Sequence, residues 1–169
     1  MTLSMYQASV PVFIRALTNL SNVLDKGIAH VEAKKIDGAA IVNFRLFPDM
    51  LPFAAQIRIA GDIAKGGGAR LAGIDPPKFE DNETTLAELS ERIKKTIAFL
   101  QTIKAEQVDG SEARDITMPT RGEPMKFKGQ GYLLGFVLPN IYFHCATAYN
   151  ILRHNGVEIG KTDFIGKQA

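Results

Sequence analysis

Apolar side chains recur every three or four residues in four long segments, which is the spacing of one face of an α-helix. The segments cover about residues 5–24, 50–71, 86–103 and 132–154, and a short helical piece is predicted over 28–35, after Gly27. The clearest stripe lies in the third segment and consists of Leu86, Leu89, Ile93, Ile97, Leu100 and Ile103. Four such helices joined by longer connections predict an all-α fold, a four-helix bundle.

Local signals predict where the helices begin and end. Ser4 with Gln7 and Thr85 with Glu88 have the spacing of capping boxes. Asp49 is predicted to cap the second helix. The dipeptide 155–156, Asn-Gly, is a strong stop signal for the last helix.

Three features interrupt the helical pattern. The three glycines at 66–68 either weaken the second helix or let another part of the chain approach it closely. Pro139 should bend the last helix, because it removes one hydrogen bond and leaves the Gly135 carbonyl without its donor. Residues 115–127 carry two short β-type runs around a turn, which predict a minor β-hairpin.

Composition narrows the class of protein. The chain has 169 residues with a formal net charge of +2, and 46% of them are hydrophobic. These values predict one folded domain over residues 1–169 and no nucleic-acid partner, since a concentrated basic stripe is missing. The single cysteine, Cys145, excludes an intrachain disulfide and is consistent with a cytoplasmic protein. Neither a signal peptide nor a membrane-spanning run is predicted, so we expect no membrane association.

Candidate chemistry centres on the last helix. Asn140 and His144 are four residues apart, so they lie on one helix face and can reach a common ligand. Gln56 is a polar residue on the otherwise apolar face of the second helix. Each of the three has a purely structural alternative as a hydrogen-bonded core or interface residue. Asp62 is predicted to be a solvent-facing charge.

Two segments carry a resemblance to a known family: residues 47–56, FPDMLPFAAQ, and residues 139–161, PNIYFHCATAYNILRHNGVEIGK. They resemble an uncharacterised domain-of-unknown-function family placed in the DinB-like (DinB/YfiT-like) superfamily of putative metalloenzymes. The resemblance covers nearly the whole chain. It implies a DinB-like four-helix bundle, often assembled as a homodimer.

The resemblance also implies where a site would lie. Many superfamily members bind a divalent metal through three histidines, and some are thiol-dependent transferases or isomerases. The matching positions here are Gln56, Asn140 and His144, so two of the three imidazoles are replaced by carboxamides. Carboxamides are poor ligands for zinc or nickel. We therefore expect no bound cofactor; a divalent metal, which the resemblance allows, would be held by these same three residues.

Three hypotheses follow. The first is a protein that binds a small polar ligand in a pocket lined by Gln56, Asn140 and His144. The second is a metal-dependent transferase or hydrolase with a degenerate ligand triad. The third is a structural dimerisation module, in which the three polar residues only satisfy one another. The sequence does not decide whether the protein is an enzyme.

Overall fold

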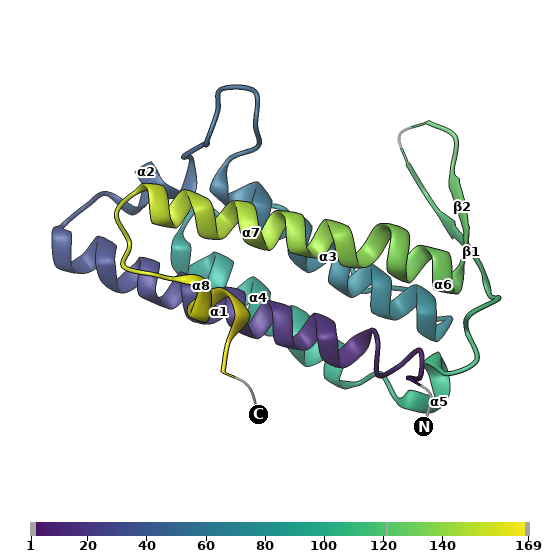
Figure 1. Ribbon diagram of the computed structural model, residues 1–169. Helices are drawn as coiled ribbons and strands as arrows, with labels where there is room; N and C mark the ends of the chain where they lie inside the picture. Colours follow the sequence, from purple (N-terminus) through teal and green to yellow (C-terminus); the bar gives the residue numbers. More distant parts are fainter. Residues whose placement is uncertain (1–2, 121, 168–169) are drawn as a thin grey trace.

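The four predicted stripes form four long helices in the computed structural model, which describes residues 3–120 and 122–167 (Figure 1). The helices are α1 (Val10–Lys34), α3 (Phe53–Ala72), α4 (Leu86–Gln101) and α7 (Leu138–His154). The predicted all-α bundle is therefore confirmed. The predicted capping box of Thr85 and Glu88 begins α4. Ser4 and Gln7 exchange the predicted hydrogen bonds, but they do so in a turn before α1, which begins at Val10 without a side-chain cap.

Shorter elements connect the long ones. Helices α2 (Gly38–Val42), α5 (Ala105–Val108), α6 (Gly129–Tyr132) and α8 (Lys161–Ile165) each span a single turn or little more. The predicted hairpin is also confirmed. Strands β1 (Asp115–Met118) and β2 (Met125–Lys128) pair antiparallel, with Asp115 opposite Lys128 and Met118 opposite Met125.

Each long helix packs against two others around one core. Helix α1 contacts α4 and α7, and α3 contacts the same two helices from the opposite corner of the bundle (Figure 1). Side chains that are completely buried come from all four long helices and include Phe13, Phe53, Leu89 and Ile151. Full burial of such a side chain contributes about 1.5–3 kcal/mol to the free energy of folding.

Gly27 does not divide the first helical region. The prediction of two pieces, 5–24 and 28–35, was wrong, because α1 runs without a break from Val10 to Lys34. A Cβ added at Gly27 would lie 3.0 Å from Leu152 Cδ2. The glycine thus serves close packing between α1 and α7, and the surrounding contacts offset its poor helix propensity.

The glycines at 66–68 have the same role in α3. The helix continues through them to Ala72, so they do not fray it. A Cβ at Gly67 would lie 2.7 Å from Val137 Cγ1, and one at Gly68 would lie 2.7 Å from Leu100 Cδ2. Of the two predicted alternatives, close approach by a neighbouring segment is the one observed.

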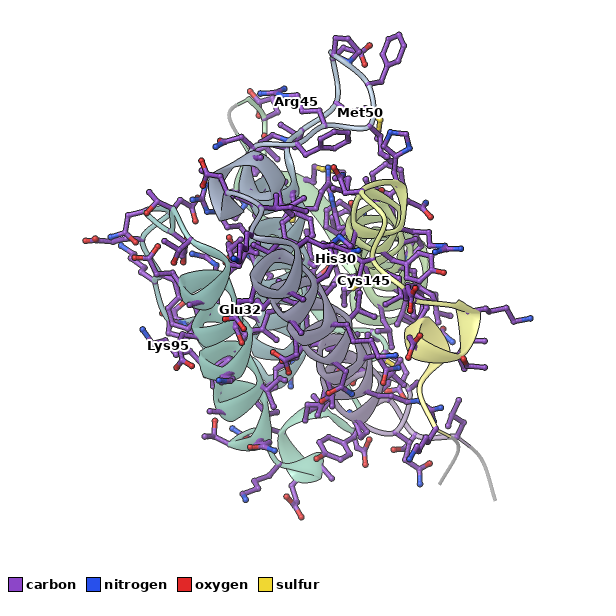
Figure 2. The ribbon with its side chains drawn as sticks, turned by 90° about the vertical axis from the view of Figure 1, so that its left-hand side faces the viewer. His30, Glu32, Arg45, Met50, Lys95 and Cys145 are labelled. Carbon is purple, nitrogen blue, oxygen red and sulfur yellow. The ribbon has the colours of Figure 1, made fainter. Side chains whose placement is uncertain are left out.

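The segment before α3 forms a loop. The predicted cap at Asp49 was wrong, because α3 begins at Phe53 after Pro52 and receives no side-chain cap. The loop closes on itself instead: Arg45 Nη1 donates to the Met50 carbonyl over 2.7 Å. Figure 2 shows these two residues in the loop that projects beyond the helix ends.

Pro139 disturbs the last helix in a specific way. Helices α6 and α7 are joined by one π-helical turn, η1 (Leu133–Val137), and Pro139 lies in the first turn of α7. Because proline lacks an N–H, it cannot continue the α-type hydrogen-bond pattern, and the turn that precedes it is widened. The predicted stop also holds, since α7 ends at His154 and Gly156 adopts a φ of 86°.

Ion pairs of the buried Arg92 connect α4 to α3 and to the loop between these helices. Arg92 is 3% exposed and binds Asp62 at 3.0 Å, Asp81 at 2.9 Å and Glu83 at 2.8 Å. Asp62 also pairs with Lys65 at 2.8 Å; its side chain is 39% exposed, so it faces solvent as predicted and also takes part in these ion pairs. Burial alone would raise the pKa of Glu83, but hydrogen bonds from Arg92 and Arg58 hold that pKa below its ordinary value.

Within residues 3–120 and 122–167, every helix is too short or too polar to cross a membrane.

Candidate functional site

Gln56 and His144 meet across the interface between α3 and α7. Gln56 lies in the first turn of α3 and is 2% exposed, and His144 lies near the middle of α7 and is 8% exposed. Gln56 Oε1 and His144 Nδ1 are 2.8 Å apart. The sequence placed both residues at one site, and the structure brings this pair together.

The neighbouring backbone fixes the orientation of the pair. Gln56 Nε2 donates to the Leu51 carbonyl over 3.0 Å, and a carbonyl can only accept. Gln56 Oε1 is therefore the atom that faces His144, and it must accept from a proton on Nδ1. This assigns the Nδ1–H tautomer to His144 and leaves a lone pair on Nε2.

Burial keeps His144 neutral. It lowers the pKa of the imidazole below its ordinary value of 6.5, because the charged form loses hydration. Nε2 makes no hydrogen bond with the residues that the structure describes. The ring also contacts Phe143, edge to face, with ring centroids 5.2 Å apart. The chemistry available here is thus that of a neutral, oriented hydrogen-bond acceptor.

Asn140 lies one turn before His144, but it does not join the pair. Its Nδ2 donates to the Phe136 carbonyl over 2.7 Å, at the junction between the π turn and α7. An asparagine whose amide donates to the backbone carbonyl one turn earlier stabilises local structure with that N–H group. Of the three predicted site residues, two are in contact and the third is engaged with its own helix.

These residues do not fit the divalent metal that the resemblance implies. Both polar atoms of Gln56 are occupied, by His144 and by the Leu51 carbonyl. That leaves one imidazole nitrogen and the Asn140 amide, far short of the three or four nitrogen, sulfur or carboxylate ligands of a zinc site. Among the described residues, no three His, Cys, Asp or Glu side chains cluster in a way that could hold a metal ion.

Sequence reasoning missed a cavity on another side of α7. It has a volume of about 380 Å³ and lies between α1, α7 and α8. Tyr142, Cys145 and Tyr149 form its α7 wall, while Gln56, Asn140 and His144 do not line it. The signal in the sequence was the spacing of these three side chains, which lie three and four residues apart and so share a helix face.

Burial also decides what Cys145 can do. The residue is 3% exposed, and burial raises the pKa of its thiol to about 12. The thiolate is the nucleophilic form, so this cysteine is unreactive near neutral pH. Cys145 lines the cavity whereas His144 contacts Gln56, so the two neighbours in sequence have different surroundings.

Comparison with known proteins adds a family and a solved structure. Residues 5–165 match the model of a family described as Domain of unknown function (DUF1993). The chain is also similar to the crystal structure of a DinB family member protein from Shewanella denitrificans, with 39% sequence identity and a TM-score of 0.86. That similarity covers 96% of this chain and 92% of the other. No curated protein matches the chain.

Proposed function

The chain belongs to the DUF1993 family of DinB-like domains of unknown function, and from this premise we propose that it binds a small polar ligand at His144. The ligand carries an N–H or O–H group that donates to Nε2 of the neutral imidazole. Gln56 acts as a positioning residue, because it holds Nδ1 and thereby aims Nε2.

The observation that carries the proposal is the asymmetry of His144. One ring nitrogen is held by a side chain that is itself fixed by the backbone, over distances of 2.8 and 3.0 Å. The other nitrogen has no partner among the described residues. Nε2 is not among the fully buried side-chain atoms of the described residues that lack a hydrogen-bond partner, so it lies where a ligand can reach it. Orientation of one nitrogen by a supporting hydrogen bond is the arrangement found where the other nitrogen contacts a ligand.

The two alternative hypotheses have less support. A metal-dependent transferase or hydrolase needs a ligand set that this site does not supply. A dimerisation module needs no oriented, unpartnered acceptor. The support for ligand binding is therefore the oriented Nε2 of His144, and the experiments below identify the ligand.

The first test measures the tautomer directly. In ¹⁵N NMR spectra that correlate ring nitrogens with ring protons, Nδ1 of His144 should have the shift of a protonated nitrogen and Nε2 that of an unprotonated one near neutral pH. The Gln56→Leu variant should lose this preference. An Nε2–H tautomer in the wild-type protein would contradict the proposal.

The second test seeks binding. A panel of small alcohols, amides and amines is screened by protein-observed NMR against the wild type, His144→Ala and, as a control, His154→Gln. We expect compounds that shift signals around His144 in the wild type and in His154→Gln, with at least tenfold weaker binding to His144→Ala. If no compound binds in a way that depends on His144, the proposal is wrong.

A further inference from the structure

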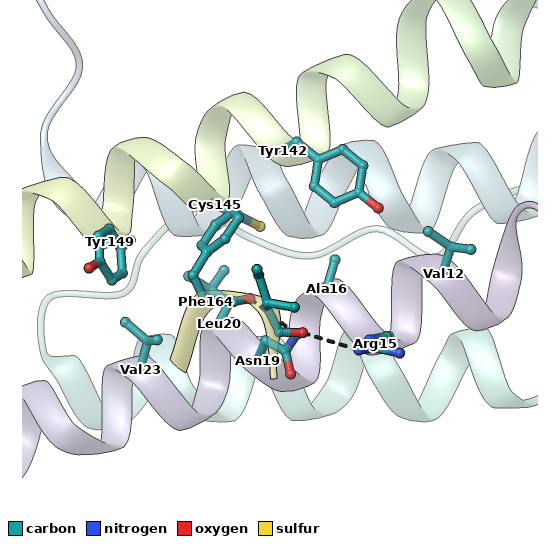
Figure 3. A pocket seen from close by; sticks show the side chains of 11 residues that line it. Val12, Arg15, Ala16, Asn19, Leu20, Val23, Tyr142, Cys145, Tyr149 and Phe164 are labelled. Atoms are coloured by element: carbon teal, nitrogen blue, oxygen red, sulfur yellow. Dashed lines mark hydrogen bonds between the residues drawn. The ribbon is translucent and has the colours of Figure 1, made fainter. Parts of the chain in front are cut away.

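The cavity between α1, α7 and α8 has the character of a binding site for an apolar molecule. Its volume of about 380 Å³ lies within the range typical of small-molecule pockets. Most of its wall is apolar, and Figure 3 shows Ala16 and Leu20 of α1 facing Tyr142 and Cys145 of α7 across the space. Contact with these side chains would remove an alkyl chain from water, which contributes about 0.8 kcal/mol for each buried CH₂ group.

Among the described residues, the only charged one that lines the cavity, Arg15, lies on its α1 side. Arg15 and Asn19, one turn apart on α1, are its polar lining residues other than the two tyrosines and the cysteine. Asn19 Nδ2 donates to the Ile165 carbonyl over 2.8 Å, so its amide is used to hold α8. The Arg15 guanidinium is exposed to solvent and makes one contact there, a 3.3 Å hydrogen bond from Nη2 to the same carbonyl.

Arg15 is therefore the charged group available to a ligand. Within the described residues its Nε and Nη1 groups donate to no protein acceptor. Guanidinium donors in this planar arrangement match a carboxylate. Cys145, at the wall, is protonated at neutral pH because burial raises the pKa of its thiol to about 12, so an occupant would be held without a covalent bond.

Helix α8 covers the cavity and is attached at its edges. Phe164 (Figure 3) and Ile165 line the cavity from α8. Beside it, Lys26 of α1 pairs with Asp163 of α8 at 2.7 Å. The cover is a helix of only five residues, none of them fully buried, held by the contact of Phe164 with Tyr149 and by polar contacts at the surface. Such short, peripheral elements open at little cost in free energy, which gives a ligand a way in.

We propose that this cavity binds a medium-chain carboxylate, with the alkyl chain between α1 and α7 and the carboxylate on Arg15. The proposal goes beyond the function proposed for His144, since it concerns a different face of α7 and a different ligand class. It does not require the His144 site to be occupied.

Calorimetry with decanoate, kept below its micelle concentration, tests the proposal on the full chain. Ala16→Phe places a ring in the cavity and should abolish binding, while Ala98→Phe, at an exposed alanine on α4, should not. Arg15→Gln should weaken binding about tenfold, in the range of one hydrogen bond to a charged group. Lys94→Gln removes an exposed positive charge elsewhere and serves as the matched control.

Decanol and decylammonium test the choice of a carboxylate. Each should bind about tenfold more weakly than decanoate to the wild type and should be insensitive to Arg15→Gln. Equal binding of all three would overturn the assignment of a carboxylate, and the absence of saturable decanoate binding would overturn the site. If Ala16→Phe instead converts a dimer to a monomer and decanoate does not bind, the cavity is a subunit interface and the proposal is wrong. None of these outcomes depends on the tautomer of His144.

Discussion

At the scale of single residues, the sequence indicated which polar side chains lie at the interface between two helices, but it did not indicate all of their hydrogen-bond partners. Gln56 and His144 were predicted to lie close together, and they form a hydrogen bond, because polar side chains on two apolar faces need a partner once they are buried. Asn140 was assigned to the same site on its spacing. Its actual partner, the Phe136 carbonyl, depends on the π turn before Pro139, which the pattern of apolar residues does not reveal.

The lowered pKa of His144 predicts a pH dependence of stability. The folded-state pKa lies below the ordinary value of 6.5 because of burial, so the unfolded chain binds a proton at a higher pH than the folded one. Stability should therefore be fully present above about pH 6.5 and decrease as pH falls toward the folded-state pKa.

Urea unfolding of the wild type and of His144→Gln at pH 8 and at pH 5 measures this effect. Between pH 8 and pH 5, the unfolding free energy of the wild type should fall by more than that of His144→Gln. The other histidines are common to both proteins and cancel. A difference that is the same at both pH values would show that His144 titrates normally in the fold.

At the scale of elements, the long helices were predictable because each carries a periodic apolar stripe, and the errors fell on glycine and on helix ends. Glycine has low helix propensity in isolation, yet Gly27 and Gly67 lie inside continuous helices. The reason is tertiary: neighbouring side chains from α7 and η1 fill the space that a Cβ would take. A single sequence does not show which segment will pack there.

This close packing predicts an unusual response to glycine replacement. Gly67→Ala should destabilise the protein by about 1–3 kcal/mol, the range for overpacking a core, because its Cβ would lie 2.7 Å from Val137 Cγ1. Gly131→Ala is the control, since Gly131 is exposed in α6 with nothing within 4 Å of an added Cβ. It should be neutral or stabilise by up to about 1 kcal/mol. Equal stabilities of the two variants in urea unfolding would contradict the packing argument.

At the scale of the whole molecule, the four apolar stripes predict the helix bundle, but they do not predict the contacts that hold its connecting loops in place. The segment between α3 and α4 was predicted only as one of the longer connections between helices. In the structure, Arg92 reaches from α4 to the carbonyl of Glu80 and to the side chains of Asp62 and Glu83. Ion pairs between residues far apart in the chain leave no periodic pattern in the sequence. Arg92 therefore could not be distinguished from a surface arginine.

The assembly of the molecule is a further prediction. The family resemblance and the prevalence of C2 pairs among soluble proteins favour a homodimer. Light scattering coupled to size-exclusion chromatography should give twice the monomer mass of 18.5 kDa. A mass of 18.5 kDa across a wide range of protein concentration would refute the dimer.

The last prediction concerns the contribution of the ion pairs of Arg92 to the stability of the bundle. Arg92 is buried, but Asp81 and Asp62 are 63% and 39% exposed, and Asp62 and Glu83 each keep another cation. Arg92→Ala should therefore cost about 1.5–3 kcal/mol in unfolding free energy, the range for hydrogen bonds to charged groups. Lys94→Ala, in the same helix, breaks a pair with Glu91 whose side chains are both 60% exposed, and it should cost less than about 0.5 kcal/mol. Arg92→Met separates charge from packing, because it keeps an apolar stem but removes the guanidinium; a loss close to that of Arg92→Ala assigns the effect to charge. If Arg92→Ala and Lys94→Ala unfold at the same urea concentration, the ion pairs of Arg92 do not fix the loop, and the interface between α3 and α4 is held by its apolar contacts alone.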